Sequence, residues 1–174
     1  MESLRIAVIG AGAWGTSLAD LLAEIGHEVT LWVLEEDLCA RMKETRENDV
    51  YLPGVSLQPA LRTTSDLAEA ASAGQELLLS VVPSQFLSRV WEGLAPSVHE
   101  EALIVSATKG LDEKTLTLPT QLIGGTLVKR GAKNAVVCLS GPTFAKELAD
   151  RKPTAIVAAS ENESAALRVQ AAFS

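Results

Sequence analysis

Apolar runs rich in β-branched residues alternate along the chain with stretches in which apolar residues recur at helical spacing. The first pattern is typical of strands buried on both faces, and the second of amphipathic helices. The predicted strands are Leu4–Ile9, Glu28–Leu34, a weak one at Ala60–Thr63, Glu76–Val82, Ala102–Ser106, Ala135–Leu139 and Thr154–Ala158. The predicted helices are Ala13–Ile25, Glu36–Glu47, Asp66–Ala73, Gln85–Leu94, Leu116–Lys129, Thr143–Ala149 and Ser164–Phe173. Repeated units of this kind predict an α/β fold, a Rossmann-like doubly wound and mostly parallel sheet, with residues 1–174 forming a single domain.

The composition fits one buried core. Of the 174 residues, 47% are hydrophobic and 21% are charged, which excludes a disordered chain. The formal net charge of −7 would repel nucleic acid or an anionic bilayer. The longest apolar stretch, Leu77–Val82, is too short to cross a membrane, and the N-terminus lacks the pattern of a signal peptide. We therefore expect a cytoplasmic protein with no nucleic-acid partner and no membrane insertion, in which a local site holds any anionic ligand.

The cysteines and histidines predict no metal site. Cys39 and Cys138 are far apart and form no CxxC motif, so we expect two reduced thiols. His27 and His99 each stand alone in the sequence, and we expect both at loop or surface positions.

The strongest motif is a glycine-rich segment between the first predicted strand and the first predicted helix, Gly10-Ala11-Gly12-Ala13-Trp14-Gly15. Gly10 permits a tight turn, Gly12 lets the backbone approach a pyrophosphate, and Gly15 lets the helix pack closely on the strand. The helix N-terminus adds free N–H groups and positive dipole character. In this position the motif predicts a dinucleotide site, and the alternative is a glycine-rich turn without a ligand.

An acidic pair at the end of the second predicted strand bears on the choice of cofactor. A carboxylate of Glu35 or Glu36 could accept hydrogen bonds from the adenosine ribose, and it would repel a 2′-phosphate. The nearest cations, Arg41 and Lys43, belong to the next predicted helix. We therefore predict NAD as the cofactor, with NADP possible; the alternative is that the two glutamates are a solvated helix start.

The loops that follow the later strands carry further candidates, because ligands of open α/β sheets bind outside the carboxyl ends of the strands. Pro83 stops the fourth predicted strand, and Phe86 could lie equally well against a flat cofactor ring or in the core. Lys109 follows the fifth strand, where its ammonium could meet an anionic or carbonyl oxygen or simply be a surface charge.

The loop after the sixth predicted strand, Ser140–Thr143, resembles a second anion site. Gly141 leaves the backbone exposed, and Thr143 offers a hydroxyl and an amide beside a predicted helix N-terminus. Ordinary helix capping by Ser140 or Thr143 is the alternative.

Taken together, these segments resemble the nicotinamide-binding N-terminal domain of glycerol-3-phosphate dehydrogenase. They are GAGAWGTSLA (10–19), LWVLEED (31–37), YLPG (51–54), VVPSQF (81–86), SATKGL (106–111) and LSGPTFAKELA (139–149). The order and spacing match over essentially the whole chain. GPTFAKELA is similar to the bacterial enzymes, whereas the acidic LWVLEED also resembles the NAD-preferring eukaryotic type.

The resemblance implies reversible hydride transfer between sn-glycerol 3-phosphate and dihydroxyacetone phosphate, at the entry to phospholipid synthesis. From the loops and the resemblance together, the expected cofactor-binding residues are Gly10, Gly12, Ala13, Trp14, Gly15, Leu34, Glu35, Pro83, Phe86, Lys109 and Ala145. The expected substrate-binding residues are Lys109, Gly141 and Thr143, with Lys109 as the catalytic residue.

In this family a second catalytic lysine and an Arg-Asn pair for the substrate phosphate lie in a helical C-terminal domain. The last predicted helix is still running at Ser174, so we expect that domain to be absent from these residues. A fragment of this kind would bind dinucleotide with little turnover, and its uncovered apolar surface could make it a homodimer. The alternatives are another dehydrogenase of the β-hydroxyacid group and a non-catalytic NAD-sensing module.

Overall fold

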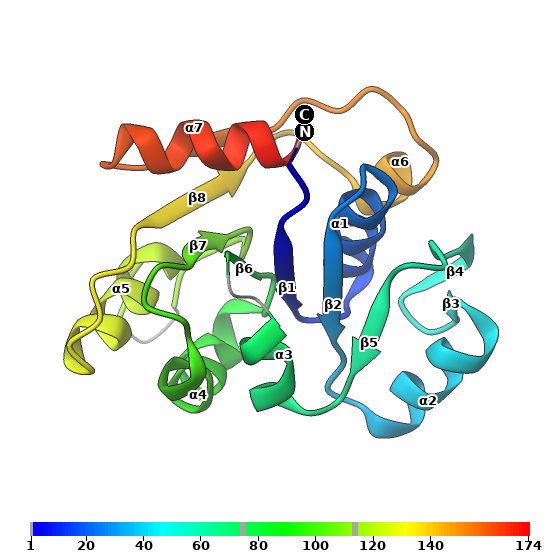
Figure 1. Ribbon diagram of the computed structural model, residues 1–174, viewed down its shortest axis with the longest axis horizontal. Helices are drawn as coiled ribbons and strands as arrows, with labels where there is room; N and C mark the ends of the chain where they lie inside the picture. Colours follow the sequence, from blue (N-terminus) through cyan, green and yellow to red (C-terminus); the bar gives the residue numbers. More distant parts are fainter. Residues whose placement is uncertain (1, 74–75, 113–114) are drawn as a thin grey trace.

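Strand β1 (Arg5–Ile9) lies between two parallel neighbours inside a seven-stranded sheet (Figure 1). The computed structural model describes residues 2–73, 76–112 and 115–174. The order across the sheet is β5-β2-β1-β6-β7-β8-β9, and all neighbouring pairs are parallel except β8 and β9. The other strands of this sheet are β2 (Glu28–Trp32), β5 (Arg62–Thr64), β6 (Leu77–Ser80), β7 (Leu103–Ser106), β8 (Val136–Ser140) and β9 (Val157–Ala159). This order confirms the predicted Rossmann-like, doubly wound and mostly parallel sheet.

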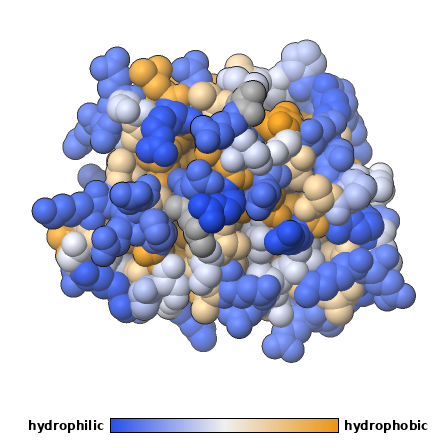
Figure 2. Space-filling model, viewed as in Figure 1, coloured by the Kyte–Doolittle hydropathy of each residue, from blue (hydrophilic) through white to orange (hydrophobic). Residues whose placement is uncertain are grey.

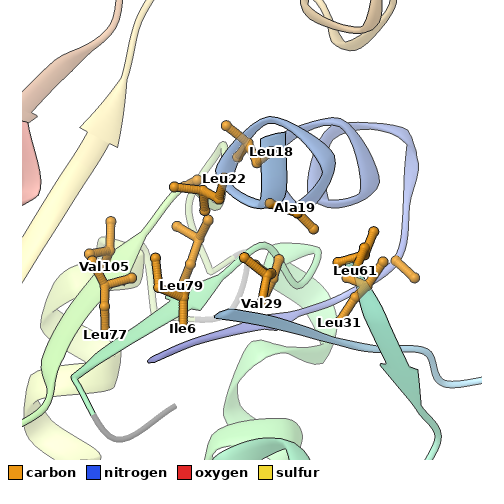
Figure 3. Packing of buried hydrophobic residues seen from close by; sticks show 14 of the residues in the cluster. Ile6, Leu18, Ala19, Leu22, Val29, Leu31, Leu61, Leu77, Leu79 and Val105 are labelled. Carbon is orange, nitrogen blue, oxygen red and sulfur yellow. The ribbon is translucent and has the colours of Figure 1, made fainter. Parts of the chain in front are cut away.

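Alternation along β1 separates two layers of core. Ile6 and Val8 enter one hydrophobic cluster, while Ala7 and Ile9 enter the other. The first cluster is covered by α1 (Ala13–Glu24), α2 (Glu36–Thr45), α6 (Ala145–Ala149) and α7 (Glu163–Ala172). The second is covered by α3 (Leu67–Ala73), α4 (Ser84–Leu94), the short 3-10 helix η1 (Ala95–Ser97) and α5 (Pro119–Lys129). Figure 3 shows Leu18 and Leu22 of α1 lying over the strand residues of the first cluster.

A short antiparallel hairpin after α2 is absent from the sequence prediction. Strands β3 (Glu47–Asn48) and β4 (Leu52–Ser56) form it as a separate two-stranded sheet. The predicted helix Glu36–Glu47 ends earlier, at Thr45, because Arg46 adopts a left-handed conformation with φ 57°. The hairpin is mostly exposed and only two to five residues per strand, so it lacks the apolar run that marks the sheet strands.

Several predicted boundaries are also wrong. The helix predicted from Leu116 begins at Pro119, since Leu116 has φ 54° and proline favours the first helical turn. The helix predicted from Thr143 begins at Ala145. The last predicted strand, Thr154–Ala158, is shifted to Val157–Ala159 and runs antiparallel to β8.

His27 lies in the loop between α1 and β2, which agrees with the expected loop position, but it is buried and so not at the surface. Its Nδ1 accepts a hydrogen bond from the Leu4 amide at 3.1 Å, and its Nε2 donates to the Ala172 carbonyl at 2.9 Å. The neutral ring therefore joins the start of β1 to the end of α7, a long-range contact that no local pattern reveals. Exposed His99 agrees with the prediction.

The surface agrees with the acidic, polar composition. Figure 2 shows a largely hydrophilic face on which hydrophobic residues form small separate groups. Within the described ranges, no helix has the length and apolar character that crossing a membrane requires. Cys39 and Cys138 are both free thiols.

A buried carboxylate on α1 ties three parts of the chain together. Asp20 has only 1% of its side chain exposed, and it accepts hydrogen bonds from the Gln58 amide and from Nη2 of Arg151, each at 2.7 Å. Arg151 also pairs with Glu24 at 2.6 Å. The pair therefore holds the segment before β5 and the segment after α6 against α1.

We expect Arg151→Met to leave the Asp20 carboxylate buried without its counter-charge. The free energy of unfolding should fall by about 2–3 kcal/mol, at the low end for a buried pair because Arg151 is partly exposed. Urea denaturation of the variant measures this loss. The matched control is Arg41→Met, which removes two exposed ion pairs, one with Asp37 and one with Asp49, and should cost less than about 1 kcal/mol. Equal losses in the two variants would contradict the role given to Asp20.

Candidate functional site

The turn from β1 into α1 depends on glycine, because a Cβ at two of its positions would collide with backbone atoms. A Cβ on Gly15 would lie 1.9 Å from the Gly10 carbonyl oxygen, so only glycine lets α1 pack this closely on the end of β1. Gly10 itself has φ 114° and comes so near the Val81 carbonyl that a Cβ there would be 2.9 Å from it. Around Gly12, in contrast, a Cβ would meet nothing within 4 Å. Gly15 thus permits the predicted close packing of helix on strand, Gly10 forms the predicted tight turn, and Gly12 borders open space.

The N-terminus of α1 is suited to an anion. Gly12 is its N-cap residue, no side chain caps the helix, and its first turn, which starts at Ala13, holds no acidic residue. The amides of the first turn and the positive end of the helix dipole therefore face the open side of Gly12. A phosphate group at this point would accept hydrogen bonds that the helix does not make internally.

The sheet order arranges the predicted site loops along one edge. Strands β2, β1, β6, β7 and β8 are consecutive neighbours and run parallel, so the loops after their carboxyl ends follow one another in that order. These loops and the first turns of the helices that follow them carry, in turn, Leu34 and Glu35, then Gly10–Gly15, Pro83 and Phe86, Lys109, and Gly141 and Thr143. The edge therefore presents an acidic group, the Gly10–Gly15 turn (called the phosphate turn after the ligand predicted from its sequence) and a lysine, in the order that an extended dinucleotide would need.

A cleft of about 500 Å³ opens beside the phosphate turn, between the loops after β6, β7 and β8. Its lining residues are Trp14, Val81, Val82, Pro83, Ser84, Gln85, Ala107, Thr108, Lys109, Thr143, Phe144 and Ala145. Among them Lys109 is the one ionisable side chain. Its Nζ donates to the Thr143 carbonyl at 3.2 Å and lies 5.5 Å from the centre of the Trp14 ring, a cation–π distance. The structure thus brings Trp14, Pro83, Lys109, Thr143 and Ala145 of the predicted set into one cleft.

Thr143 differs from its expected role in one respect. Its amide, predicted to be free at a helix N-terminus, donates to the Gly141 carbonyl at 3.0 Å, and α6 begins only at Ala145. Its hydroxyl, however, is buried and has no hydrogen-bond partner among the described residues. A buried hydroxyl without a partner is costly, and it is suited to a polar ligand atom in the cleft.

Gly141 packs against backbone rather than leaving it open. A Cβ at this position would lie 2.6 Å from the Ala155 carbonyl oxygen. The glycine is therefore needed for the close approach of the chain that leads into β9.

The acidic end of the edge is organised by a tyrosine. The Tyr51 hydroxyl donates to Oε1 of Glu35 at 2.8 Å, and this hydrogen bond together with the carboxylate charge raises the pKa of Tyr51. Arg41, the nearest cation considered for a 2′-phosphate, is already bound by Asp37 and Asp49. A carboxylate is thus held at the end of β2, and the adjacent guanidinium is occupied.

Two apolar candidates stand out from the protein surface. Phe86 is 52% exposed in the first turn of α4, which excludes the core alternative, and Leu34 is 67% exposed after β2. Neither lines the cleft, so an extended ligand would have to reach them along the edge.

The sequence prediction missed polar residues that hold the loops. Asn48 is fully buried and bonds the Ala11 carbonyl, and the Thr108 hydroxyl donates to the Val82 carbonyl at 2.9 Å. Ser17 lies within 3.0 Å of the Ala145 carbonyl and so joins α1 to α6. The only sequence signal for these residues is polar type near a motif, and for Asn48, three residues before YLPG, nothing in the sequence predicts the hairpin that buries it.

Metal ligation has no support within the described ranges, where no group of three or more His, Cys, Asp or Glu side chains is placed to hold an ion.

Comparison with known proteins gives a consistent result. A family model described as the N-terminus of NAD-dependent glycerol-3-phosphate dehydrogenase matches residues 5–166. A curated glycerol-3-phosphate dehydrogenase [NAD(P)+] of Geobacter sp. (strain M21) is 48% identical over 169 residues, which are 97% of this chain and 50% of that protein. The corresponding protein of Syntrophotalea carbinolica is 44% identical over 171 residues.

A solved structure shows the same fold. The crystal structure of glycerol-3-phosphate dehydrogenase from Coxiella burnetii superimposes with a TM-score of 0.89 at 30% identity and covers 99% of this chain and 51% of that one. The chain therefore spans about half the length of the relatives it matches. On the family match and these identities, the chain belongs to the family of NAD-dependent glycerol-3-phosphate dehydrogenase N-termini.

Proposed function

We propose that this chain is the dinucleotide-binding half of a glycerol-3-phosphate dehydrogenase, which interconverts sn-glycerol 3-phosphate and dihydroxyacetone phosphate with NAD(P). The observation that carries the proposal is the open space at Gly12 in front of the uncapped α1 N-terminus, between Glu35 on one side and the Lys109 cleft on the other. Family membership supplies the substrate class. The reaction would place the protein at the entry to glycerophospholipid synthesis.

Each part of the edge has a role in this proposal. The amides at Gly12–Gly15 bind the pyrophosphate, Glu35 accepts hydrogen bonds from the adenosine ribose, and Phe86 borders the nicotinamide half. When bound, NAD(P) supplies the hydride acceptor or donor. Lys109 polarises the substrate carbonyl with its ammonium group, and the unpartnered Thr143 hydroxyl offers a further hydrogen bond to the substrate.

The cleft as formed by these residues is incomplete for rapid turnover. Hydride transfer to a carbonyl needs a proton donor as well as polarisation, and among the residues that the structure describes Lys109 is the one ionisable side chain that lines the cleft. We therefore propose that residues 1–174 on their own bind cofactor and substrate but convert them slowly.

Gly12→Ala tests the phosphate turn. The added Cβ meets no protein atom within 4 Å and φ is −65°, so the free energy of unfolding should fall by no more than about 1 kcal/mol. The methyl group would occupy the side from which a pyrophosphate approaches, and the Kd for NADH should rise at least about tenfold. Fluorescence titration measures this change.

The matched control for that variant is Gly125→Ala, the same substitution in α5 with nothing within 4 Å. It should leave NADH affinity unchanged and stabilise the helix by up to about 1 kcal/mol. Unchanged NADH affinity in Gly12→Ala as well would remove the phosphate turn from the proposal.

Cofactor preference follows from Glu35. We expect NADH to bind more tightly than NADPH, because the carboxylate would face the 2′-phosphate and Arg41 is occupied by two aspartates. Glu35→Gln removes the charge while keeping the shape, and it should narrow the ratio of the two Kd values at least about threefold. Tighter binding of NADPH to the unsubstituted chain would refute this assignment.

Lys109→Met tests the substrate side of the cleft. It should raise the Kd for NADH less than about fivefold but weaken binding of dihydroxyacetone phosphate to the NADH complex at least about tenfold, because a charged hydrogen bond is lost. Titration of NADH fluorescence with the chain measures the Kd for NADH. Quenching of that fluorescence on addition of dihydroxyacetone phosphate then measures substrate binding to the NADH complex. Lys133→Met, an equal charge change three residues before β8 at the opposite edge of the sheet, is the control and should alter neither Kd. An unaltered response to dihydroxyacetone phosphate in Lys109→Met would exclude Lys109 from the substrate site.

A further inference from the structure

The hairpin of β3 and β4 lies against both parts of the proposed cofactor site. Asn48, in β3, reaches the β1–α1 turn, while Tyr51, between the two strands, reaches Glu35 at the end of β2. No motif in the sequence assigns this hairpin a role. Its most buried polar side chain is Asn48, with 0% of its surface exposed.

The side chain of Asn48 makes hydrogen bonds through both its NH₂ group and its carbonyl oxygen. Its Nδ2 donates to the Ala11 carbonyl and to the Thr16 hydroxyl, both at 2.8 Å, and its Oδ1 accepts from the Tyr51 amide at 3.0 Å. Because the carbonyl can only accept and the amide can only donate, the carboxamide fits in one orientation. The Thr16 hydroxyl in turn donates to the same Ala11 carbonyl at 3.2 Å.

This arrangement bears on the phosphate turn through the geometry of one peptide bond. The Ala11 carbonyl and the Gly12 N–H belong to the same planar trans peptide unit, so they point in opposite directions. Two donors inside the protein hold the Ala11 oxygen inward. The Gly12 N–H is thereby turned away from the hairpin, and a Cβ built on the same residue would meet no protein atom within 4 Å.

We propose that Asn48 is a positioning residue for dinucleotide binding: by holding the Ala11 carbonyl inward, it aims the Gly12 N–H at the pyrophosphate. The inference rests on the proposed function, since it assumes that the dinucleotide binds at this turn. Asn48 touches neither cofactor nor substrate in this account. It acts only through the peptide that it fixes.

Asn48→Asp is the most direct test, because aspartate keeps the size of the side chain and an acceptor for the Tyr51 amide but loses both donors. The Ala11 carbonyl then keeps only the Thr16 hydroxyl as a donor and faces a carboxylate oxygen that repels it, so the peptide between Ala11 and Gly12 is no longer held inward and the Kd for NADH should rise at least about tenfold. The titration is carried out on the 174-residue chain at a temperature where circular dichroism shows every variant fully folded.

Asn134→Asp is the matched control. Asn134 also holds a loop through Nδ2, which donates to the carbonyls of His99, Glu100 and Ala102 at 2.9–3.0 Å, but it precedes β8 at the amino end of the sheet. A purely structural effect would lower the Tm of both variants and leave them with the same Kd for NADH. We expect the Kd of Asn134→Asp for NADH to stay within about twofold of that of the unsubstituted chain. A folded Asn48→Asp variant that binds NADH as tightly as Asn134→Asp does would overturn the proposal.

Two further measurements keep the outcome decisive. If Asn48→Asp does not fold, Thr16→Val is measured instead, because it removes the second donor to the Ala11 carbonyl. The Kd for NADH should rise about threefold. An unchanged Kd for this variant would overturn the proposal. In ligand-free NMR spectra, the Gly12 amide resonance should move in Asn48→Asp and stay in place in Asn134→Asp. This readout is independent of binding, so an unsubstituted chain that fails to bind NADH refutes the proposed function, whereas an unmoved Gly12 resonance refutes the role of Asn48.

Discussion

The close contact between α1 and the carbonyl of Gly10 determines how the rest of the edge is built. With no Cβ at Gly15, the helix packs directly on the end of β1, and its N-terminus, which no side chain caps, lies beside the open space at Gly12. Every neighbouring loop is then placed by the parallel order of the strands. A larger residue at Gly15 would push the helix away from the strand, and the anion-binding geometry would be lost with the packing.

Polar side chains inside the protein keep this edge in shape where the ladder hydrogen bonds of the sheet end. Asn48 and Thr16 fix the turn after β1, Thr108 joins the loop after β7 to the loop after β6, and Tyr51 holds Glu35. These residues come from segments far apart in sequence. Because the bonds of Asn48, Thr16 and Thr108 are made between buried or partly buried groups, the loops that they join lie in defined positions before any ligand arrives, which lowers the ordering cost of binding.

The sequence predicted the features that depend on local pattern. The buried strands, the flanking helices and the phosphate turn all follow from apolar periodicity and from glycines at a strand-to-helix junction, and the structure has them in place. Features that depend on long-range contacts were missed. The β3–β4 hairpin has no apolar run of its own, and His27 is buried only because α7 returns to the start of β1. The amide of Thr143 is used within its own loop, since the helix predicted to begin there starts two residues later. The sequence left Phe86 open between a cofactor contact and a core position, and only its exposure in the structure excludes the core.

The central claim is that the amides at the start of α1 bind the pyrophosphate of a nicotinamide dinucleotide. The most direct measurement is an NMR titration of the ¹⁵N-labelled chain with NADH, which follows every backbone amide at once. The account predicts that the largest shifts fall on Gly12, Ala13, Trp14 and Gly15, with smaller ones after β2 and β6. Saturable binding that leaves these four amides unmoved, or no shifts at all, would contradict it.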